Sequence, residues 1–301
     1  LGTVVVRAGR AVARQGDAGG PPRPVRAALA AASGLVLVVS PLVAGPAQAA
    51  SSGGLCPAGS RPVTYDVAAF SLTIPLNGWG DRLPDGQMYA LRGPDARVGK
   101  AQVTANPNLS EPLVVRANVG DCVTVTLRND LGRRVGLHPD GLVQFDPETS
   151  DGARVGRNPD TTVQPGATTT YTWYADKQGE APISDIANVD DADPAHSSVQ
   201  NGLYGAVVVH PRGSVWTNPV TGADLLDPVT GRAVETRAFA DVATPAGALR
   251  SYAMVLMDEV EDVVDRDGRQ PTFPTTGLPD STFGINYRSE PLRNRLRAIL
   301  E

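Results

Sequence analysis

The sequence EPLVVRANVGDCVTVTLRNDLGRRVGLHPDGLVQF, residues 111–145, contains the pattern that decides the fold. Its middle part alternates apolar and polar side chains, and the apolar ones are Val123, Val125 and Leu127. A period of two is typical of a β-strand with one buried face. A tight turn at Gly120 precedes this segment, and Asn129-Asp130 ends it before the chain reaches His138. We therefore expect a pair of strands whose far end carries a histidine.

Other short segments show strand patterns separated by turns rich in Gly and Pro: Val63–Val67, Phe70–Ile74, Met88–Leu91, Ala167–Tyr174 and Gly202–Val209. Long amphipathic helical patterns are absent from this part of the sequence. Many short strands without helices predict an all-β fold, an antiparallel Greek-key sandwich over residues 63–209. We expect Tyr171 and Trp173 to join the three residues named above in its core.

The sequence after this unit predicts a linker and a second, incomplete one. Residues 215–237 contain two similar turn sequences, at Asn218–Gly222 and Asp227–Gly231, and read as a linker. Residues 249–257 form a clear strand pattern, and residues 290–301 have apolar side chains at helical spacing. The expected organisation is a signal peptide at 1–49, a first domain at 50–214, the linker at 215–237 and a partial second domain at 238–301.

The first 49 residues resemble a cleavable export signal. A short apolar run at residues 27–43 is preceded by five arginines: Arg7, Arg10, Arg14, Arg23 and Arg26. After it, Ala47-Gln48-Ala49 offers small residues at a cleavage site. The alternative is a membrane anchor, but Ser33, Gly34, Ser40 and Pro41 interrupt the run. We expect secretion, with no stable membrane anchor after cleavage. A net charge of −5 and the lack of a basic patch argue against a nucleic-acid partner.

Two cysteines, Cys56 and Cys122, are present, and both follow the predicted signal. Export would place them in an oxidising compartment, which favours a disulfide between them. Cys122 lies on the strand face opposite Val123, so it should point away from that core. The competing interpretation is a copper thiolate, which requires two histidines nearby, and none is near Cys122 in the sequence.

Four stretches together carry a family resemblance: EPLVVRANVGDCVTVTLRNDL, HPDG, QPGATTTYTWYAD and NGLYGAVVVHP. In this order they resemble the first cupredoxin domain of large, secreted bacterial multicopper oxidases, and FGINYRSEPLRNRL resembles part of the second domain. The likeness covers roughly residues 56–295. It implies tandem cupredoxin-like β-sandwiches and copper-dependent transfer of electrons from a substrate to dioxygen.

The copper motifs depart from the family pattern. His138 matches the first position of the family's His-x-His motif, but Asp140 occupies the second. The region of the next motif, residues 183–188, has no histidine, although His196 follows. The chain has three histidines in all, too few for a trinuclear cluster, and no histidine-flanked cysteine. His138 and His196 are the candidate metal ligands, and His210 reads as a surface residue.

Two functional hypotheses remain. In the first, the chain is the N-terminal module of a secreted multicopper oxidase-like protein, inactive alone, whose copper site is completed by further cupredoxin domains or subunits. In the second, it is a copper-free cupredoxin-like scaffold for binding or assembly. Acidic residues could also bind a hard cation such as calcium, although such runs are more often solvated loops: Asp185, Asp190, Asp191 and Asp193, and Asp258, Glu259, Glu261 and Asp262.

Overall fold

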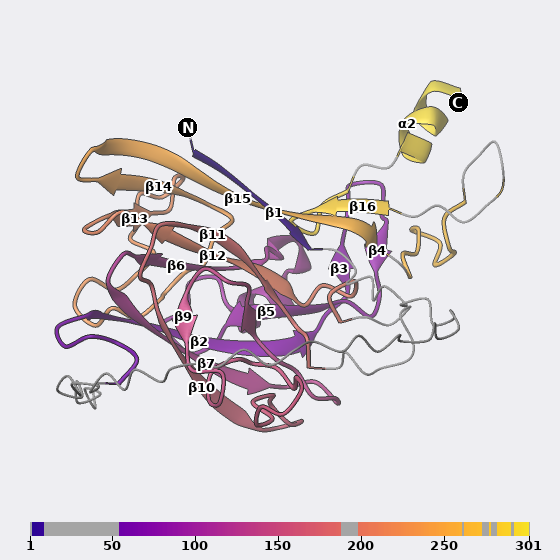
Figure 1. The fold of residues 1–301 in the computed structure, drawn as a ribbon. Helices are drawn as coiled ribbons and strands as arrows, with labels where there is room; N and C mark the ends of the chain where they lie inside the picture. The colour runs from indigo at the N-terminus through magenta and orange to yellow at the C-terminus, as the bar shows by residue number, and fades with distance from the viewer. Residues whose placement is uncertain are drawn as a thin grey trace, which may run out of the picture. The chain divides into compact units, whose positions relative to one another are not determined.

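The computed structural model describes residues 2–8, 54–187, 198–260, 262–272, 277, 282–289 and 292–300. This part of the chain is nearly all β (Figure 1). The strands are β1 (Gly2–Ala8), β2 (Arg61–Ser71), β3 (Ile74–Pro75), β4 (Arg82–Leu83), β5 (Gln87–Leu91), β6 (Leu113–Asn118), β7 (Asp121–Asn129), β8 (His138–Pro139), β9 (Gln144–Phe145), β10 (Thr168–Tyr174), β11 (Gly179–Ser184), β12 (Tyr204–His210), β13 (Val215–Thr217), β14 (Phe239–Thr244), β15 (Gly247–Val260) and β16 (Thr282–Ile285). The short helices are α1 (Lys100–Ala105), η1 (Pro107–Leu109) and α2 (Leu292–Leu300).

Two sheets enclose the main core. The first sheet has the strand order β5-β2-β7-β10-β9, and the second has the order β6-β12-β11-β8. Strand β7 alternates between buried and half-buried positions along its length, as the sequence pattern predicts. All five predicted core side chains are buried in one cluster: Val123, Val125, Leu127, Tyr171 and Trp173. The expected sandwich is therefore confirmed, with its apolar side chains packed between the two sheets.

The prediction that this sandwich is purely antiparallel is wrong. Strand β2 pairs with β7 in parallel, and β6 pairs with β12 in parallel. In both cases the paired strands are separated in the chain by strands of the other sheet. A chain that crosses to the opposite sheet before it returns can re-enter beside its earlier strand in the same direction. Burial patterns within single strands carry no information about this direction.

A third sheet follows, with the order β1-β15-β14-β13 and β16 also paired to β15. The predicted strand at residues 249–257 lies inside β15, and the predicted C-terminal helix is α2. A second apolar cluster joins this sheet to the second sheet and includes Val208, Val255 and Met257. The second sheet is therefore buried on both faces, which explains why every residue of β6 and β12 is buried.

Residues 215–237, the predicted linker, pack on the first sandwich. The backbone N–H of Thr64 donates to Gly231 at 3.0 Å, and that of Ala233 donates back to Thr64 at 2.8 Å. Trp216 and Leu225 are buried in the main core. The segment therefore contributes to the core of the sandwich, while the domain boundaries themselves stay predictions.

Candidate functional site

His138 lies on the two-residue strand β8, at the edge of the second sheet. Its register partner is Ser184 on β11, and the adjacent Pro139 pairs with Ile183. The histidine side chain is 23% exposed, which places it at the rim of the sandwich. Its ring meets Phe145 edge-on, with 5.9 Å between ring centroids. The His138 side chain is therefore partly accessible to solvent, while the contact with Phe145 restrains its ring.

The Nδ1 atom of His138 is held by one residue, Asp151. It lies 2.8 Å from the carboxylate Oδ1 and 2.9 Å from the backbone carbonyl of that aspartate. Both oxygens are acceptors, so Nδ1 carries the hydrogen and donates it. In the neutral ring the lone pair then belongs to Nε2. This is the arrangement in which an outer carboxylate orients an imidazole for a metal.

Two glycines allow the segments that carry His138 and Asp151 to approach closely. A Cβ atom added to Gly136 would lie 1.9 Å from the carbonyl oxygen of Gly152. One added to Gly152, whose φ is +66°, would lie 2.5 Å from the carbonyl oxygen of Leu137. Any side chain at either position would push the two backbones apart. The contact between histidine and aspartate therefore depends on these glycines.

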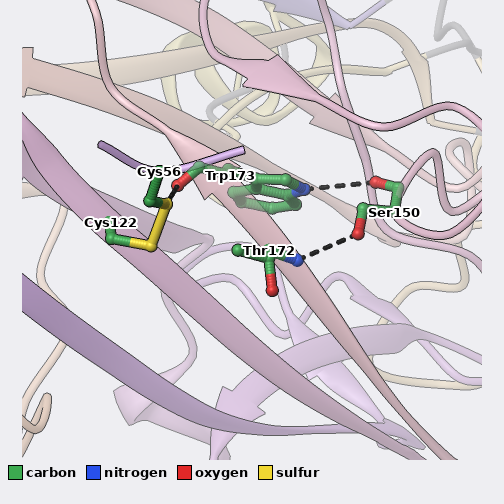
Figure 2. Close-up of a disulfide and its surroundings, with 5 residues drawn as sticks. All are labelled: Cys56, Cys122, Ser150, Thr172 and Trp173. Atoms are coloured by element: carbon green, nitrogen blue, oxygen red, sulfur yellow. Dashed lines mark hydrogen bonds between the residues drawn. A yellow bond between two sulfur atoms is a disulfide. The ribbon is translucent and has the colours of Figure 1, made fainter. Parts of the chain in front are cut away.

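Strand β10 is hydrogen-bonded to Ser150, the residue before Asp151 (Figure 2). The indole Nε1 of Trp173 donates to the carbonyl of Ser150 at 3.3 Å, and the Thr172 N–H donates to its hydroxyl at 3.1 Å. Ser150 immediately precedes Asp151. The first sheet is thus connected, through Ser150, to the residue that orients the rim histidine.

The predicted disulfide lies beside the same strand (Figure 2). Cys56 and Cys122 are bonded, with Cα atoms 5.7 Å apart, and Cys122 pairs in register with Tyr174 of β10. Cys122 points away from the main core, as expected, since it is half-buried between buried neighbours. Both cysteines are engaged in this bond, so the alternative of a copper thiolate does not apply.

The two aspartates at the family's histidine positions have different surroundings. Asp140 is exposed, and its backbone N–H donates to the Pro182 carbonyl at 3.0 Å. Asp185 is buried and accepts hydrogen bonds from the N–H groups of Gly136 at 2.7 Å and Ala187 at 3.0 Å. Burial raises the pKa of the Asp185 carboxyl above its usual range. Asp185, which directly follows β11, thus ties that strand to the segment that leads into His138.

The other candidate ligands do not complete a metal centre in the described part of the chain. His196 lies outside the described residues, as do Asp190, Asp191 and Asp193. Among the described residues, no three His, Cys, Asp or Glu side chains gather where they could hold a metal ion. These residues therefore fit a single imidazole donor, His138, and not a full copper site. In the same part of the chain, no helix is long and apolar enough to cross a membrane.

The segment that carries this rim is similar to known proteins. Residues 92–214, which include β6–β12 and His138, match the sequence model of the multicopper oxidases. The match covers less than half of the chain and supports a multicopper oxidase-like domain over residues 92–214. Among curated proteins, none matches the chain. The matched segment spans most of the cupredoxin-like sandwich that the sequence pattern predicts.

Several solved structures are similar to the chain. A multicopper oxidase from Pseudomonas thermotolerans is 16% identical, with a TM-score of 0.41, over 77% of this chain and 43% of its own. The multicopper oxidase mgLAC is 17% identical, with a TM-score of 0.42, over 77% and 55%. A laccase from Pediococcus acidilactici is 17% identical, with a TM-score of 0.35, over 52% and 28%. The chain thus spans from about a quarter to about half of the length of these proteins.

The expectation that His210 is a surface residue is wrong. Its side chain is buried, and its ring lies 5.7 Å from that of Trp216. Nη1 of Arg116 lies 3.1 Å from its Nε2. Burial and the nearby arginine lower the pKa of His210 to about 3. The residue ends β12 as predicted, but the linker segment covers it, which its position before Pro211 does not reveal.

Sequence reasoning also missed Asp151, the residue that orients His138. It lies 13 residues from His138 in a segment without strand periodicity. The Ser150-Asp151-Gly152 sequence offered a weak signal, a polar residue beside a glycine of the kind used for close backbone approach. That signal is common to ordinary turns, so only the contact itself distinguishes this aspartate.

Proposed function

We propose that this chain is the N-terminal cupredoxin module of a secreted, multicopper oxidase-like protein. In this proposal His138 supplies one imidazole to a copper site that further cupredoxin domains or subunits complete. The observation that carries it is the contact between Nδ1 of His138 and Asp151, because it leaves Nε2 available at an accessible rim. A histidine that serves packing alone does not need a carboxylate that selects its tautomer.

The donor set limits what the chain can do alone. Copper in such proteins prefers imidazole and thiolate ligands. Both sulfurs are in the disulfide, and His210 is committed to the contact with Arg116 inside the protein. His196 remains the candidate second imidazole, and Asp140 is an exposed oxygen donor two residues from His138. A bound copper would supply electron transfer, and this chain would contribute an oriented ligand and its support.

Oxidation of a substrate by dioxygen therefore belongs, in this proposal, to the complete assembly. Reduction of dioxygen to water takes four electrons, and the chain has three histidines with which to hold the metals that would carry them. We also propose that residues 1–49 are an export signal, which is consistent with the disulfide because such bonds persist in oxidising compartments.

The first prediction concerns copper binding by the purified full chain. We expect Cu²⁺ to bind weakly, with an electron paramagnetic resonance spectrum that shows coupling to imidazole nitrogen. The variant His138→Ala should lose this signal. The variant Asp151→Asn should weaken binding by roughly 10- to 100-fold, the usual cost of removing an outer partner of a metal-bound histidine.

Controls separate this site from incidental binding. His196→Ala shows whether the second candidate histidine takes part, and Asp227→Asn, which changes a partly exposed carboxylate in the segment 215–237, should leave the spectrum unchanged. Oxygen uptake with a phenolic donor should be absent in every variant. Sustained turnover or a blue thiolate band would contradict the proposal for the chain alone. An absence of copper binding would favour the copper-free scaffold.

A further inference from the structure

Gly136, which lies two residues before His138, is held at both of its backbone polar groups. Its carbonyl oxygen accepts a hydrogen bond from Oη of Tyr89 at 2.5 Å, and its N–H donates to Oδ1 of Asp185 at 2.7 Å. Tyr89 lies on β5 of the first sheet, and Asp185 directly follows β11 of the second. Both side chains are buried. The backbone of Gly136 is therefore fixed from both sheets of the sandwich.

The side chain of Asp185 points into the core, away from the face that carries His138. Buried and half-buried positions alternate along residues 181–187, and Asp185 is buried together with Ile183. Ser184, the register partner of His138, belongs to the half-buried set. Paired residues share a face, and successive side chains of a strand point to opposite faces. In this fold Asp185 therefore cannot bind a metal together with His138, although it stands at a histidine position of the family.

Asp185 also borders the segment that carries Asp151. The residue that follows it, Ile186, forms a parallel bridge with Ala153, two residues after Asp151. Oδ1 of Asp185 accepts a second hydrogen bond, from the N–H of Ala187 at 3.0 Å, which restrains the chain at this bridge. The segments that carry the rim histidine and its aspartate are therefore both attached next to the same buried carboxylate.

The contact between His138 and Asp151 depends on the position of Gly136. Loss of either partner would leave a buried backbone group of Gly136 without a hydrogen bond, which is unfavourable enough to shift the segment toward water or another partner. The ring of His138 is only two residues further along the chain, and Nδ1 lies 2.8 Å from Oδ1 of Asp151. A shift of this segment would therefore loosen the contact that leaves Nε2 available.

We propose that Tyr89 and Asp185 are positioning residues for His138. Their hydrogen bonds to Gly136 hold the start of β8, so that Nδ1 of His138 stays on Asp151 and Nε2 stays available to copper. Asp185 then contributes a hydrogen-bond acceptor that supports the imidazole, and no ligand to the metal. This inference deepens the proposed function and rests on it for the role of His138 as a copper ligand.

The second prediction is tested on the full chain without metal, by NMR of ¹⁵N-labelled histidine. The nitrogen chemical shifts show which ring nitrogen carries the hydrogen, and the variant His138→Ala assigns the signals of that residue. The wild type should carry the hydrogen on Nδ1. Asp185→Ala and Tyr89→Phe each remove one partner of Gly136, so both should lose this preference and show a mixture of the two tautomers.

Two further variants separate positioning from general loosening. Asp185→Asn keeps an acceptor oxygen for the N–H of Gly136 and should restore the Nδ1 tautomer. Tyr65→Phe is the matched control, because it removes a buried tyrosine hydroxyl that donates to a backbone carbonyl elsewhere, that of Arg116, at 2.8 Å. This variant should keep the wild-type tautomer.

Several results would overturn the positioning role. An unchanged tautomer in Tyr89→Phe, or in folded Asp185→Ala, would do so, because both hydrogen bonds are needed to fix Gly136. A mixture of tautomers in Tyr65→Phe or in Asp185→Asn would also overturn it. Circular dichroism identifies variants that fail to fold, and if Asp185→Ala is among them, Tyr89→Phe alone decides the outcome.

Copper binding then distinguishes this inference from the proposed function. In a titration with Cu²⁺ followed by electron paramagnetic resonance, the affinity should fall roughly tenfold or more in Asp185→Ala and Tyr89→Phe, as for other outer partners of a metal-bound histidine. Asp185→Asn should keep the wild-type affinity. If the wild type binds no copper, the proposed function fails and the tautomer measurement still decides the positioning role. If it binds copper while both variants keep its tautomer and affinity, the positioning role is wrong and the proposed function stands.

Discussion

At the scale of single residues, the buried pair of Arg116 and His210 has a defined protonation state. An arginine has no acceptor, so Nε2 of His210 must accept the hydrogen bond from Arg116 and the imidazole must be neutral. Ser251 accepts a second bond from the same Nη1 at 2.9 Å. Burial lowers the pKa of the arginine to about 10, which still leaves it charged at neutral pH. Proton uptake by His210 would place two positive charges in contact.

The third prediction follows from this pair. The pKa of His210 is about 6.5 in the unfolded chain and about 3 in the folded one, so below pH 6.5 the unfolded chain binds a proton that the folded chain excludes. The free energy of unfolding should therefore fall as the pH drops through this window, by up to about 1.4 kcal/mol per pH unit from this group. Urea unfolding between pH 7 and 5 measures the slope.

The variant His210→Gln keeps an acceptor for Arg116 but does not titrate, so its slope should be shallower than that of the wild type. Val229→Gln changes an exposed, non-titrating residue and should keep the wild-type slope. An unchanged slope in His210→Gln would contradict the assignment of this pH dependence to His210.

At the scale of elements, β7 and β10 are the structural basis of the rim site. Their antiparallel register joins Cys122 to Tyr174 and Val123 to Trp173. On one side the disulfide fixes the segment before β2 to β7, and on the other Trp173 and Thr172 hold Ser150. The histidine at the rim is therefore positioned by a chain of contacts that begins in a rigid strand pair.

The fourth prediction concerns the disulfide, whose cysteines are 66 residues apart in the sequence. Closing a loop of this length in the unfolded chain should stabilise the protein by about 4 kcal/mol. The double variant Cys56→Ser and Cys122→Ser should lose about this much in urea unfolding and should keep the β-rich circular dichroism spectrum. A reducing agent should have the same effect on the wild type and none on the variant. Equal stability of the two proteins would contradict the prediction.

At the scale of the whole described unit, the three sheets share side chains. The main core includes Trp216 and Val242 from the third sheet, and the second cluster joins β12 to β15. Arg116 on β6 donates to Ser251 on β15, and the buried ion pair of Asp81 with Arg293, at 2.7 Å, anchors α2 to the turn before β4. Through these contacts the third sheet packs directly on the first sandwich.

The fifth prediction is that residues 54–300 unfold in one cooperative transition. Separate unfolding of the third sheet would expose the buried faces of β6 and β12, so the two parts should melt together. Differential scanning calorimetry should show a single transition, with a calorimetric enthalpy close to the van't Hoff value. The substitution Val255→Ala should lower the midpoint of that transition without splitting it. Two resolved transitions would show that the third sheet is an independent domain.

The sequence by itself determined the strands, the core residues and the disulfide of this protein. Alternation with a period of two identified β7 and β10 because it depends on neighbours within one strand, and Trp173 and Val125 are buried as expected. The two cysteines could be paired because no others exist in the chain. The strand pattern also placed His138 just after β7. The departures from the family's histidine motifs, such as Asp140, can be read from the sequence itself.

Only the tertiary structure decided which sheet faces which, and therefore which residues make the site. The contact of Asp151 with His138 requires two glycines that bring separate segments together, and the burial of His210 requires residues 215–237 to fold back over β12. The parallel pairs arise from crossings between sheets. The physical reason is the same throughout: periodicity reports whether a side chain is buried, whereas the identity of its covering neighbour depends on chain paths that local patterns do not encode.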